Sequence, residues 1–349
     1  MALPNHTVFK DLTADQVHTA LAPLGVTPGI ARRLQAAVFR TGALPRSLSG
    51  VSPKVMDAVR DAARVPHLAL VEKIISPQDG FVRYLFRSDG PETFETVRIP
   101  LLHKPDDPKY IVCVSSQVGC ALGCAFCATG RMGFRRDLAA WEIVDQAAAV
   151  QADSPHPVRC VVFMGMGEPL LNYDIVIRAA RILSEPCAMA ISGKAITIST
   201  AGIVAGIRRF TAEGHPYRLV VSLSFADPAV RRAWMPVEAD NPTSELIEAL
   251  RAYHAATGRR VTLAWTMLAG VNTRAEDARQ LAALTRGLPV KLDLIDVNDP
   301  TGRCRAPSAF ELAAFRDALR AHMAMPVARR YSGGRDIHAA CGMLAGGQD

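Results

Sequence analysis

The stretch Gly119-Cys-Ala-Leu-Gly-Cys-Ala-Phe-Cys-Ala-Thr-Gly130 places three cysteines, Cys120, Cys124 and Cys127, within one short loop. Thiolates are soft ligands that suit zinc or an iron–sulfur cluster. A structural zinc ion needs four protein ligands, and no Cys or His follows closely enough to complete the set. A [4Fe-4S] cluster on three thiolates keeps one iron open for a further ligand. The loop therefore predicts such a cluster, with a distantly completed zinc site or three buried thiols as alternatives.

The sequence around this loop alternates between strand and helix patterns. Apolar, β-branched runs typical of buried parallel strands cover 110–114, 159–164, 195–199, 218–223, 261–265 and 290–295. Helical patterns cover 138–152, 174–184, 203–213, 243–256, 275–286 and 308–324. Six strand–helix units predict an α/β fold with a parallel sheet, either doubly wound or an incomplete barrel.

Polar and glycine residues cluster where the predicted strands end, which is where such folds carry their chemistry. The segment Gly165-Met-Gly-Glu-Pro169 follows the second strand; its glycines allow backbone carbonyls to approach a ligand, and Glu168 adds an acceptor. A tight turn explains this segment equally well when it is taken alone. The other polar residues that end or follow a strand are Ser199, Ser222, Ser224 and Asn298.

The remaining sequence predicts two further units. Residues 1–67 carry helical patterns near 14–23, 29–41 and 52–63, and we expect a helical accessory domain with a helix-hairpin-helix-like turn. Residues 68–105 alternate apolar and polar positions, which predicts antiparallel strands that extend the sheet. Residues 106–349 form the α/β core. With 49% hydrophobic residues, the chain can bury a large core.

Charge and cysteine content bear on partners and location. Lys and Arg number 40 against 33 Asp and Glu, and many arginines occur in pairs. Arginine donates to two phosphate oxygens at once, so we expect a nucleic-acid substrate, with Arg131, Arg135 and Arg136 nearest the reaction; solvated helix faces are the alternative. The absence of a long apolar stretch or signal-peptide pattern, and eight cysteines, predict a cytoplasmic protein without a membrane anchor.

The cysteine loop, with Phe126 before its last cysteine, resembles that of the radical S-adenosylmethionine (SAM) enzymes. Further segments narrow the resemblance to the RlmN/Cfr family of radical SAM RNA methyltransferases, from about Glu95 to Leu344. These segments are Cys113-Val-Ser-Ser-Gln-Val-Gly-Cys120, Met164-Gly-Met-Gly-Glu-Pro-Leu-Leu-Asn172, Ser222-Leu223 and Asp336-Ile-His-Ala-Ala-Cys-Gly-Met-Leu344.

This resemblance implies a radical SAM partial (β/α)6 barrel with a [4Fe-4S] cluster and SAM as cofactors. It implies methylation of an adenosine ring carbon, C2 first, in 23S rRNA and/or tRNA. Cys120, Cys124 and Cys127 would hold the cluster. The residues expected around SAM are Gly167, Glu168, Ser199, Ser222, Leu223, Ser224 and Asn298.

The family chemistry assigns three further roles. Cys341 would become the S-methylcysteine intermediate, Cys113 would resolve the RNA adduct through a transient disulfide with Cys341, and Glu95 would accept the ring proton. A flavodoxin or ferredoxin system would donate electrons to a monomeric enzyme.

Four residues depart from the family pattern. Ser224 stands where His is usual, Val297 and Asp299 flank Asn298 where Trp and Pro are common, and Met343 replaces Gln. Methylation of adenosine C8, or of another RNA, therefore stays open. From other classes, a radical SAM activase or peptide modifier and an RNA-binding protein with a structural cluster stay open as alternatives.

Overall fold

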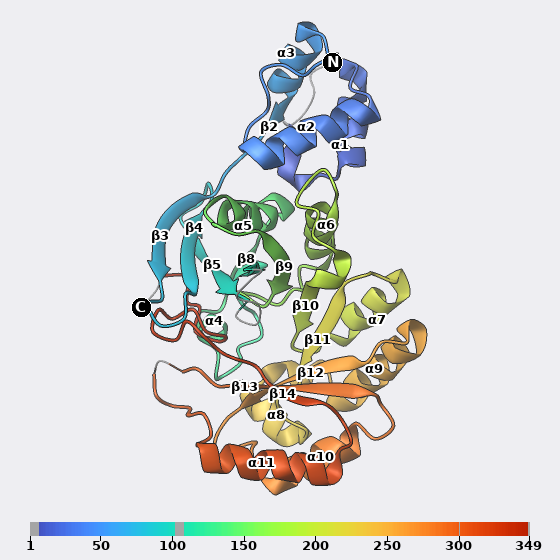
Figure 1. The fold of residues 1–349 in the computed structure, drawn as a ribbon. Helices are drawn as coiled ribbons and strands as arrows, with labels where there is room; N and C mark the ends of the chain where they lie inside the picture. The colour runs from blue at the N-terminus through green and yellow to red at the C-terminus, as the bar shows by residue number, and fades with distance from the viewer. Residues whose placement is uncertain (1–6, 102–107, 300, 348–349) are drawn as a thin grey trace.

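The computed structural model of the chain describes residues 7–101, 108–299 and 301–347. Its centre is a ten-stranded sheet in the order β14-β13-β12-β11-β10-β9-β6-β5-β4-β3 (Figure 1). The strands from β6 to β14 pair in parallel. They are β6 (Tyr110–Cys113), β9 (Val158–Phe163), β10 (Ile196–Thr200), β11 (Arg218–Ser222), β12 (Val261–Met267), β13 (Val290–Asp296) and β14 (Val327–Arg329).

These parallel strands lie side by side in chain order. A doubly wound sheet reverses its strand order at a switch point, whereas this sheet winds in one direction as a (β/α) barrel does. The sheet has β14 and β3 at its two edges, so the barrel is incomplete. The predicted partial barrel is therefore confirmed.

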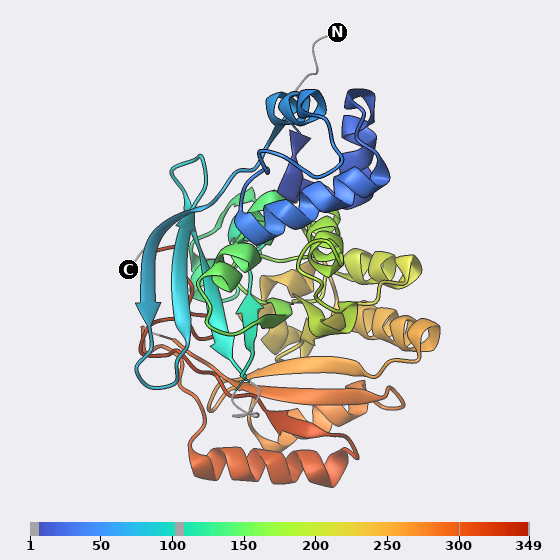
Figure 2. The same cartoon turned by 45° about the horizontal axis from the view of Figure 1, so that its top comes forward.

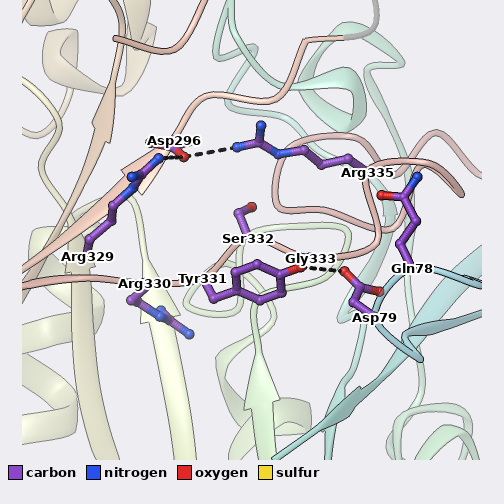
Figure 3. A pocket seen from close by; sticks show the side chains of 9 residues that line it. All are labelled: Gln78, Asp79, Asp296, Arg329, Arg330, Tyr331, Ser332, Gly333 and Arg335. Atoms are coloured by element: carbon purple, nitrogen blue, oxygen red, sulfur yellow. Dashed lines mark hydrogen bonds and ion pairs between the residues drawn. The ribbon is translucent and has the colours of Figure 1, made fainter. Parts of the chain in front are cut away.

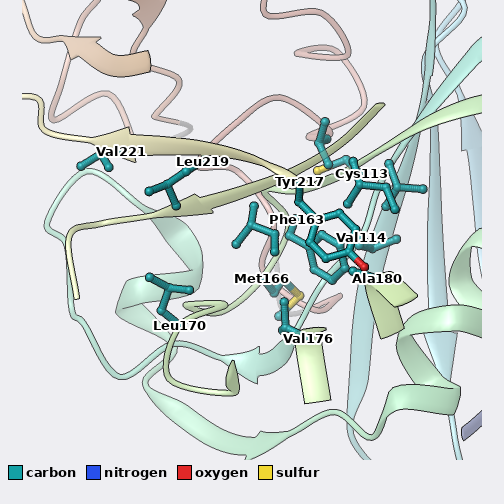
Figure 4. Close-up of a cluster of buried hydrophobic side chains, with 14 of the residues drawn as sticks. Cys113, Val114, Phe163, Met166, Leu170, Val176, Ala180, Tyr217, Leu219 and Val221 are labelled. Carbon is teal, nitrogen blue, oxygen red and sulfur yellow. The ribbon is translucent and has the colours of Figure 1, made fainter. Parts of the chain in front are cut away.

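Helices follow the parallel strands and cover the outer side of the sheet, along the arc from α5 to α11 in Figure 1. They are α5 (Ala140–Ala152), α6 (Tyr173–Ser184), α7 (Val204–Glu213), α9 (Thr243–Thr257), α10 (Ala275–Leu284) and α11 (Ala309–His322). Each lies within a few residues of its predicted range. Figure 4 shows Val176 and Ala180 of α6 in one buried cluster with Phe163 of β9 and Val114, which follows β6. This continuous apolar core fixes the strand ends that carry the polar residues.

Three antiparallel strands extend the sheet on the amino-terminal side of β6. They are β3 (Ala69–Ile75), β4 (Val82–Arg87) and β5 (Thr93–Pro100), and β5 pairs with β6. The predicted β extension is thus present. The predicted boundary at residue 105 lies outside the described residues.

The amino-terminal helices form a unit with its own hydrophobic cluster, and this unit lies above α5 and α6 in Figure 2. The helices are α1 (Ala14–Leu21), α2 (Pro28–Thr41) and α3 (Pro53–Ala62). Thr13, Thr27 and Ser52 cap them by accepting from backbone amides of the first turn. β1 (Thr7–Val8) and β2 (Ala63–Arg64) pair in parallel beside them. The domain boundary near residue 67 stays a prediction.

Several short elements complete the described chain. They are β7 (Gln117–Gly119), β8 (Phe134–Asp137), α4 (Ala128–Arg131), α8 (Pro228–Trp234) and 3-10 turns at Phe9–Asp11, Ala22–Leu24, Gly193–Ala195 and Pro236–Ala239. In the ranges described, no helix has both the length and the apolar character needed to cross a bilayer.

Candidate active site

The cysteine loop begins at the β7–β8 hairpin and ends at α4, which starts directly after Cys127. Gly119 has φ +72, and a Cβ on it would lie 1.8 Å from the carbonyl oxygen of Gly133. Only glycine therefore allows the two strands of the hairpin to approach at this point. At the far end of the loop the Cys127 amide donates to the Cys124 carbonyl at 3.1 Å.

The three thiols interact with one another electrostatically. Burial raises the pKa of Cys120 to about 12, and the Cys127 thiol adds to this shift. Burial, with Cys127 and Cys120 next in importance, also raises the pKa of Cys124. Such thiols become ligands only when a positive centre stabilises their thiolates. Three neighbouring soft donors of this kind fit a [4Fe-4S] cluster.

No three His, Cys, Asp or Glu side chains of the described residues are arranged around a point where one metal ion could sit. An iron–sulfur cluster, by contrast, attaches its cysteine ligands to several irons.

A cavity opens beside the loop, with about 950 Å³ of space not filled by protein atoms, part of it open to solvent. It lies at the carboxyl ends of the parallel strands, as predicted. Most of the expected site residues line it, namely Cys120, Cys124, Cys127, Gly167, Glu168, Ser199, Ser222, Asn298 and Cys341. Leu223, Ser224, Cys113 and Glu95 are not among its lining residues.

Asn298 lines this cavity and has an acceptor that no described residue uses. Its Nδ2 donates to the Ser332 hydroxyl (2.8 Å) and to the carbonyls of Asp296 and Cys341 (3.0 and 3.2 Å). Its buried Oδ1 has no hydrogen-bond partner among the described residues. A buried carbonyl oxygen without a partner is costly, so a bound ligand that donates there would stabilise it. The hydroxyl and ammonium groups of SAM are donors of this type.

Glu168 links two loops around the cavity. Its Oε1 accepts from the Leu170 amide (3.0 Å) and its Oε2 from the Ala201 amide (2.8 Å), which ties the loop after β9 to the end of β10. Burial raises the pKa of Glu168 to about 7. A Cβ on Gly167 would lie 2.5 Å from the Gln117 Cβ, so this glycine is needed for packing against the cysteine-loop region. The carboxylate holds the wall of the cavity in place.

Leu223 and Ser224 lie behind the cavity wall. Leu223 is fully buried, and its carbonyl accepts from Arg231 Nε at 3.3 Å. Ser224 is also fully buried, with φ 55, and its hydroxyl accepts from the Thr266 amide at 3.2 Å. Both residues shape the end of β11, and the Ser224 hydroxyl is already used within the protein.

The segment with Cys341 is attached directly to the cysteine loop. The Ala128 amide donates to the Gly342 carbonyl (2.8 Å), and the Thr129 hydroxyl donates to the Leu344 carbonyl (2.7 Å). Cys341 is exposed and lines the cavity together with the three loop cysteines. The chain thereby brings a fourth thiol to the site from its far end.

Cys113 lies at the end of β6, within the hydrophobic core (Figure 4). Burial raises the pKa of Cys113 to about 12, and the Cys341 thiol is the next largest cause. Cys113 and Cys341 are therefore near enough to interact, although both are free thiols in this structure.

Glu95 is a buried residue rather than the surface carboxylate that an isolated strand position would suggest. It is 0% exposed, and Arg83 Nη1 donates to its Oε1 at 3.0 Å. The amides of Ala345 and Gly346 donate to its Oε2 at 2.7 and 2.9 Å. Glu95 therefore anchors the segment that follows Cys341.

The arginines near the loop differ in their burial and in the carboxylates with which they pair. Arg136 donates twice to Glu142 (2.8 and 2.9 Å), and Arg131 lies 3.5 Å from Asp299. Arg231, which is followed directly by Arg232, is fully buried, forms an ion pair with Glu238 and donates to the Ala201 carbonyl at 2.6 Å. Through its contacts with the carbonyls of Ala201 and Leu223, it links the ends of β10 and β11. No sequence signal separates this buried arginine from the surface ones, because its carboxylate partner is recognised only in the fold.

Comparisons with known proteins agree with the family resemblance seen in the sequence. The radical SAM superfamily matches residues 114–282. A "Probable RNA methyltransferase" of Myxococcus xanthus is 48% identical over 97% of this chain and 94% of its own length. The "Dual-specificity RNA methyltransferase RlmN" of Syntrophobacter fumaroxidans is 39% identical over 96% of this chain and 97% of its own.

A crystal structure of a radical SAM methyltransferase from Sphaerobacter thermophilus matches with a TM-score of 0.88 and 35% identity, over 97% of this chain and 99% of that one. The fold, the relatives and their coverage agree, and with them the cofactors of the family, a [4Fe-4S] cluster and SAM. The chain belongs to the RlmN/Cfr family of radical SAM RNA methyltransferases.

Proposed function

We propose that the protein methylates a ring carbon of an adenosine, C2 as the first candidate, in 23S rRNA and/or tRNA, with Cys341 as the methyl carrier. One observation carries the proposal: Cys341 lines the same cavity as Cys120, Cys124 and Cys127, although it comes from the opposite end of the core. An enzyme that used the cluster only to modify a peptide would have no need of a thiol there.

The side chains around the cavity have different proposed roles. Cys120, Cys124 and Cys127 would hold the cluster, and Gly167, Glu168, Ser199, Ser222 and Asn298 would surround SAM, with Leu223 and Ser224 supporting the wall. When bound there, the cluster and SAM would supply a carbon radical able to remove a hydrogen atom. The Asn298 Oδ1 offers the acceptor that such a ligand would fill, and the buried Glu168 keeps the two loops at a fixed separation.

Cys341 is suited to its role because it is an exposed thiol that faces the cavity. As a thiolate it accepts a methyl group and becomes a thioether. Loss of one hydrogen atom from this S-methyl group leaves a carbon that adds to the adenine ring. The ring position is electron-poor, so it accepts a carbon radical more readily than it accepts a methyl cation.

Release of the product needs a base and a second thiol. Glu95 would take the ring proton once the amides of Ala345 and Gly346 leave its Oε2. The unpaired electron of the adduct would return to the oxidised cluster. Cys113, as a thiolate, would then attack the sulfur of Cys341, so that the carbon–sulfur bond breaks, a disulfide forms and the released carbon takes up a proton to become the methyl group. A thiol reductant restores both residues. We place this cycle in the cytoplasm of a monomeric enzyme, with a flavodoxin or ferredoxin system as electron donor.

The test uses anaerobically reconstituted protein with SAM, dithionite and RNA from cells that lack the modification. Mass analysis of digested RNA should show a C2-methyladenosine that is absent with Cys341→Ala. A C8-methyladenosine would keep the chemistry and correct the position. Full RNA methylation by Cys341→Ala, or deoxyadenosine formation without any methylated RNA, would contradict the proposal.

A further inference from the structure

A second cavity lies next to the candidate active site, between the β3–β4 turn and the chain that follows β14. It has about 850 Å³ of space not filled by protein atoms, part of it open to solvent. Figure 3 shows its lining side chains, with Arg329 and Arg335 directed toward Asp296 from two sides. The lining residues are Gln78, Asp79, Asp296, Arg329, Arg330, Tyr331, Ser332 and Arg335, with Gly333. Apart from that glycine, every lining residue has a polar side chain, which suits a charged ligand.

The arginines of this cavity hold more positive charge than its carboxylates neutralise. Arg329 Nη2 and Arg335 Nη2 both donate to one oxygen, Oδ2 of Asp296, at 2.6 and 3.0 Å. Their side chains are 48% and 50% exposed. A guanidinium group has five N–H donors, so each keeps most of its donors available. Two arginines that share one carboxylate can still bind phosphate.

Arg330 joins the two cavities, because it lines both. Its Nη1 lies 3.5 Å from the sulfur of Met164, and no carboxylate of a described residue pairs with it. A ligand of the second cavity that contacts Arg330 would therefore lie next to the cavity that Cys341 lines. For a polymer substrate, this is the position of the units that flank the target.

Tyr331 provides a surface for a base. The residue is 66% exposed. Its hydroxyl donates to Asp79 at 3.0 Å, and its ring makes an edge contact with Phe81 at 6.2 Å. The ring is thus held from two sides while much of it faces solvent. Aromatic rings held in this way stack on unpaired RNA bases.

We propose that this cavity binds the RNA strand next to the target adenosine, with Arg329, Arg330 and Arg335 as phosphate ligands and Tyr331 as the stacking surface for a flanking base. The inference rests on the proposed function, and it names the contact by which that function would position its substrate. An enzyme that modifies a ring carbon must first take the base out of its stack. Contacts to the neighbouring nucleotides hold the strand while the target base is displaced.

The phosphate contacts are tested with the full-length, reconstituted protein and a fluorescein-labelled tRNA transcript without modified bases. Anisotropy gives the Kd over a range of KCl concentrations. Arg329→Gln/Arg335→Gln should weaken binding roughly tenfold or more. It should also reduce the slope of log K against log [KCl] by about 1 for each lost phosphate contact.

The matched control is Arg279→Gln/Arg320→Gln, on α10 and α11. These arginines are 67% and 65% exposed and each pairs with one carboxylate, but neither lines the cavity. Equal affinity and equal salt slope in the two double variants would overturn the proposal. Because the first double variant leaves Asp296 unpaired, a triple variant that adds Asp296→Asn repeats the measurement with that charge removed.

Tyr331 gives an independent test, since its exposed ring can be removed without opening the core. Tyr331→Ala should weaken RNA binding by roughly five- to a hundredfold, whereas Tyr331→Phe should bind within about twofold of wild type because the ring remains. Equal Kd values for Tyr331→Ala and wild type would contradict the stacking role. Wild-type protein could yield no methylated RNA while the arginine variants still show a smaller slope of log K against log [KCl]. In that case the proposed function fails and the RNA contact stands.

Discussion

At the scale of single residues, the site consists of cysteines whose surroundings differ. Cys341 is exposed, whereas Cys113 lies in the core with a pKa raised to about 12 by burial and then by Cys341. This difference suits a carrier thiol that meets cofactor and RNA and a resolving thiol that acts last. A buried resolving thiol is protected from reacting before the adduct forms.

The raised pKa of Cys113 predicts how product release depends on pH. Below that pKa, the thiolate fraction increases about tenfold for each pH unit. In a single turnover, decay of the RNA–protein adduct should therefore accelerate from pH 7 to pH 9, and Cys113→Ala should accumulate the adduct. Gel electrophoresis under denaturing conditions measures the adduct. A decay rate that is constant over this range would exclude Cys113 as the resolving nucleophile.

Glu168 predicts a stability effect. Glu168→Gln keeps the acceptor for one amide but turns an N–H group toward the other, so that a buried donor loses its partner. The free energy of unfolding should fall by about 1–3 kcal/mol. Urea titration measures this change, and Glu245→Gln, on the exposed side of α9, serves as the control. Equal stability of the two variants would show that the link between the loops contributes little.

At the scale of elements, the close approach of β7 and β8 determines the shape of the cysteine loop. Gly119→Ala would place a Cβ against the Gly133 carbonyl at a positive φ. The hairpin must then shift, and we expect the variant to lose most of its iron and sulfide after reconstitution. Gly258→Ala also has a positive φ but open space around it, and it should keep its iron. Equal iron content in both variants would contradict this account of the loop.

The sequence predicts the elements well where a pattern is long. The strand and helix ranges of the barrel differ from the structure by only a few residues, because buried apolar runs and amphipathic helices leave a clear period. β14 spans Val327–Arg329 and was missed, since three residues carry no period and the strand exists through pairing with β13. The seven-residue α8 was also missed, although Asp227 caps it before Pro228.

The candidate site likewise includes residues that the sequence predicts and residues that it does not. The three loop cysteines and most of the strand-end residues line one cavity, as predicted, because spacing and topology place them together. The second cavity could not be predicted, since Asp79 and Arg335 are brought together only by the fold. The burial of Arg231 and Glu95 could not be predicted for the same reason: Arg231 donates to the Ala201 carbonyl and Glu95 accepts from the Gly346 amide, and both partners lie in other segments of the chain.

At the scale of the whole molecule, the two ends of the chain pack against the barrel through buried polar contacts. The carboxyl-terminal segment is held by Glu95 and Thr129. The amino-terminal unit is held by an ion pair between Lys10 and Asp145, whose side chains are only 2% and 3% exposed. The Leu68 amide donates to the same aspartate at 2.7 Å. These contacts join the accessory helices, the extension and the barrel.

Removal of Lys10 should therefore destabilise the protein. Lys10→Met leaves the Asp145 charge buried with one charged partner fewer, which typically costs about 3–5 kcal/mol. The double variant Lys10→Met/Asp145→Asn should recover part of this loss. Urea titrations of the three proteins measure the effect. A single variant as stable as wild type would show that the ion pair does not hold the amino-terminal unit.

The central claim is that Cys341 carries the methyl group to RNA. The most direct measurement supplies SAM with a deuterated methyl group to the reconstituted protein, followed by peptide mass mapping and then by mass analysis of the RNA product. The account predicts deuterated methyl on Cys341 before RNA is added, and a product that holds one deuterium fewer than the SAM methyl group. An unlabelled Cys341, or a product that retains every deuterium, would contradict it.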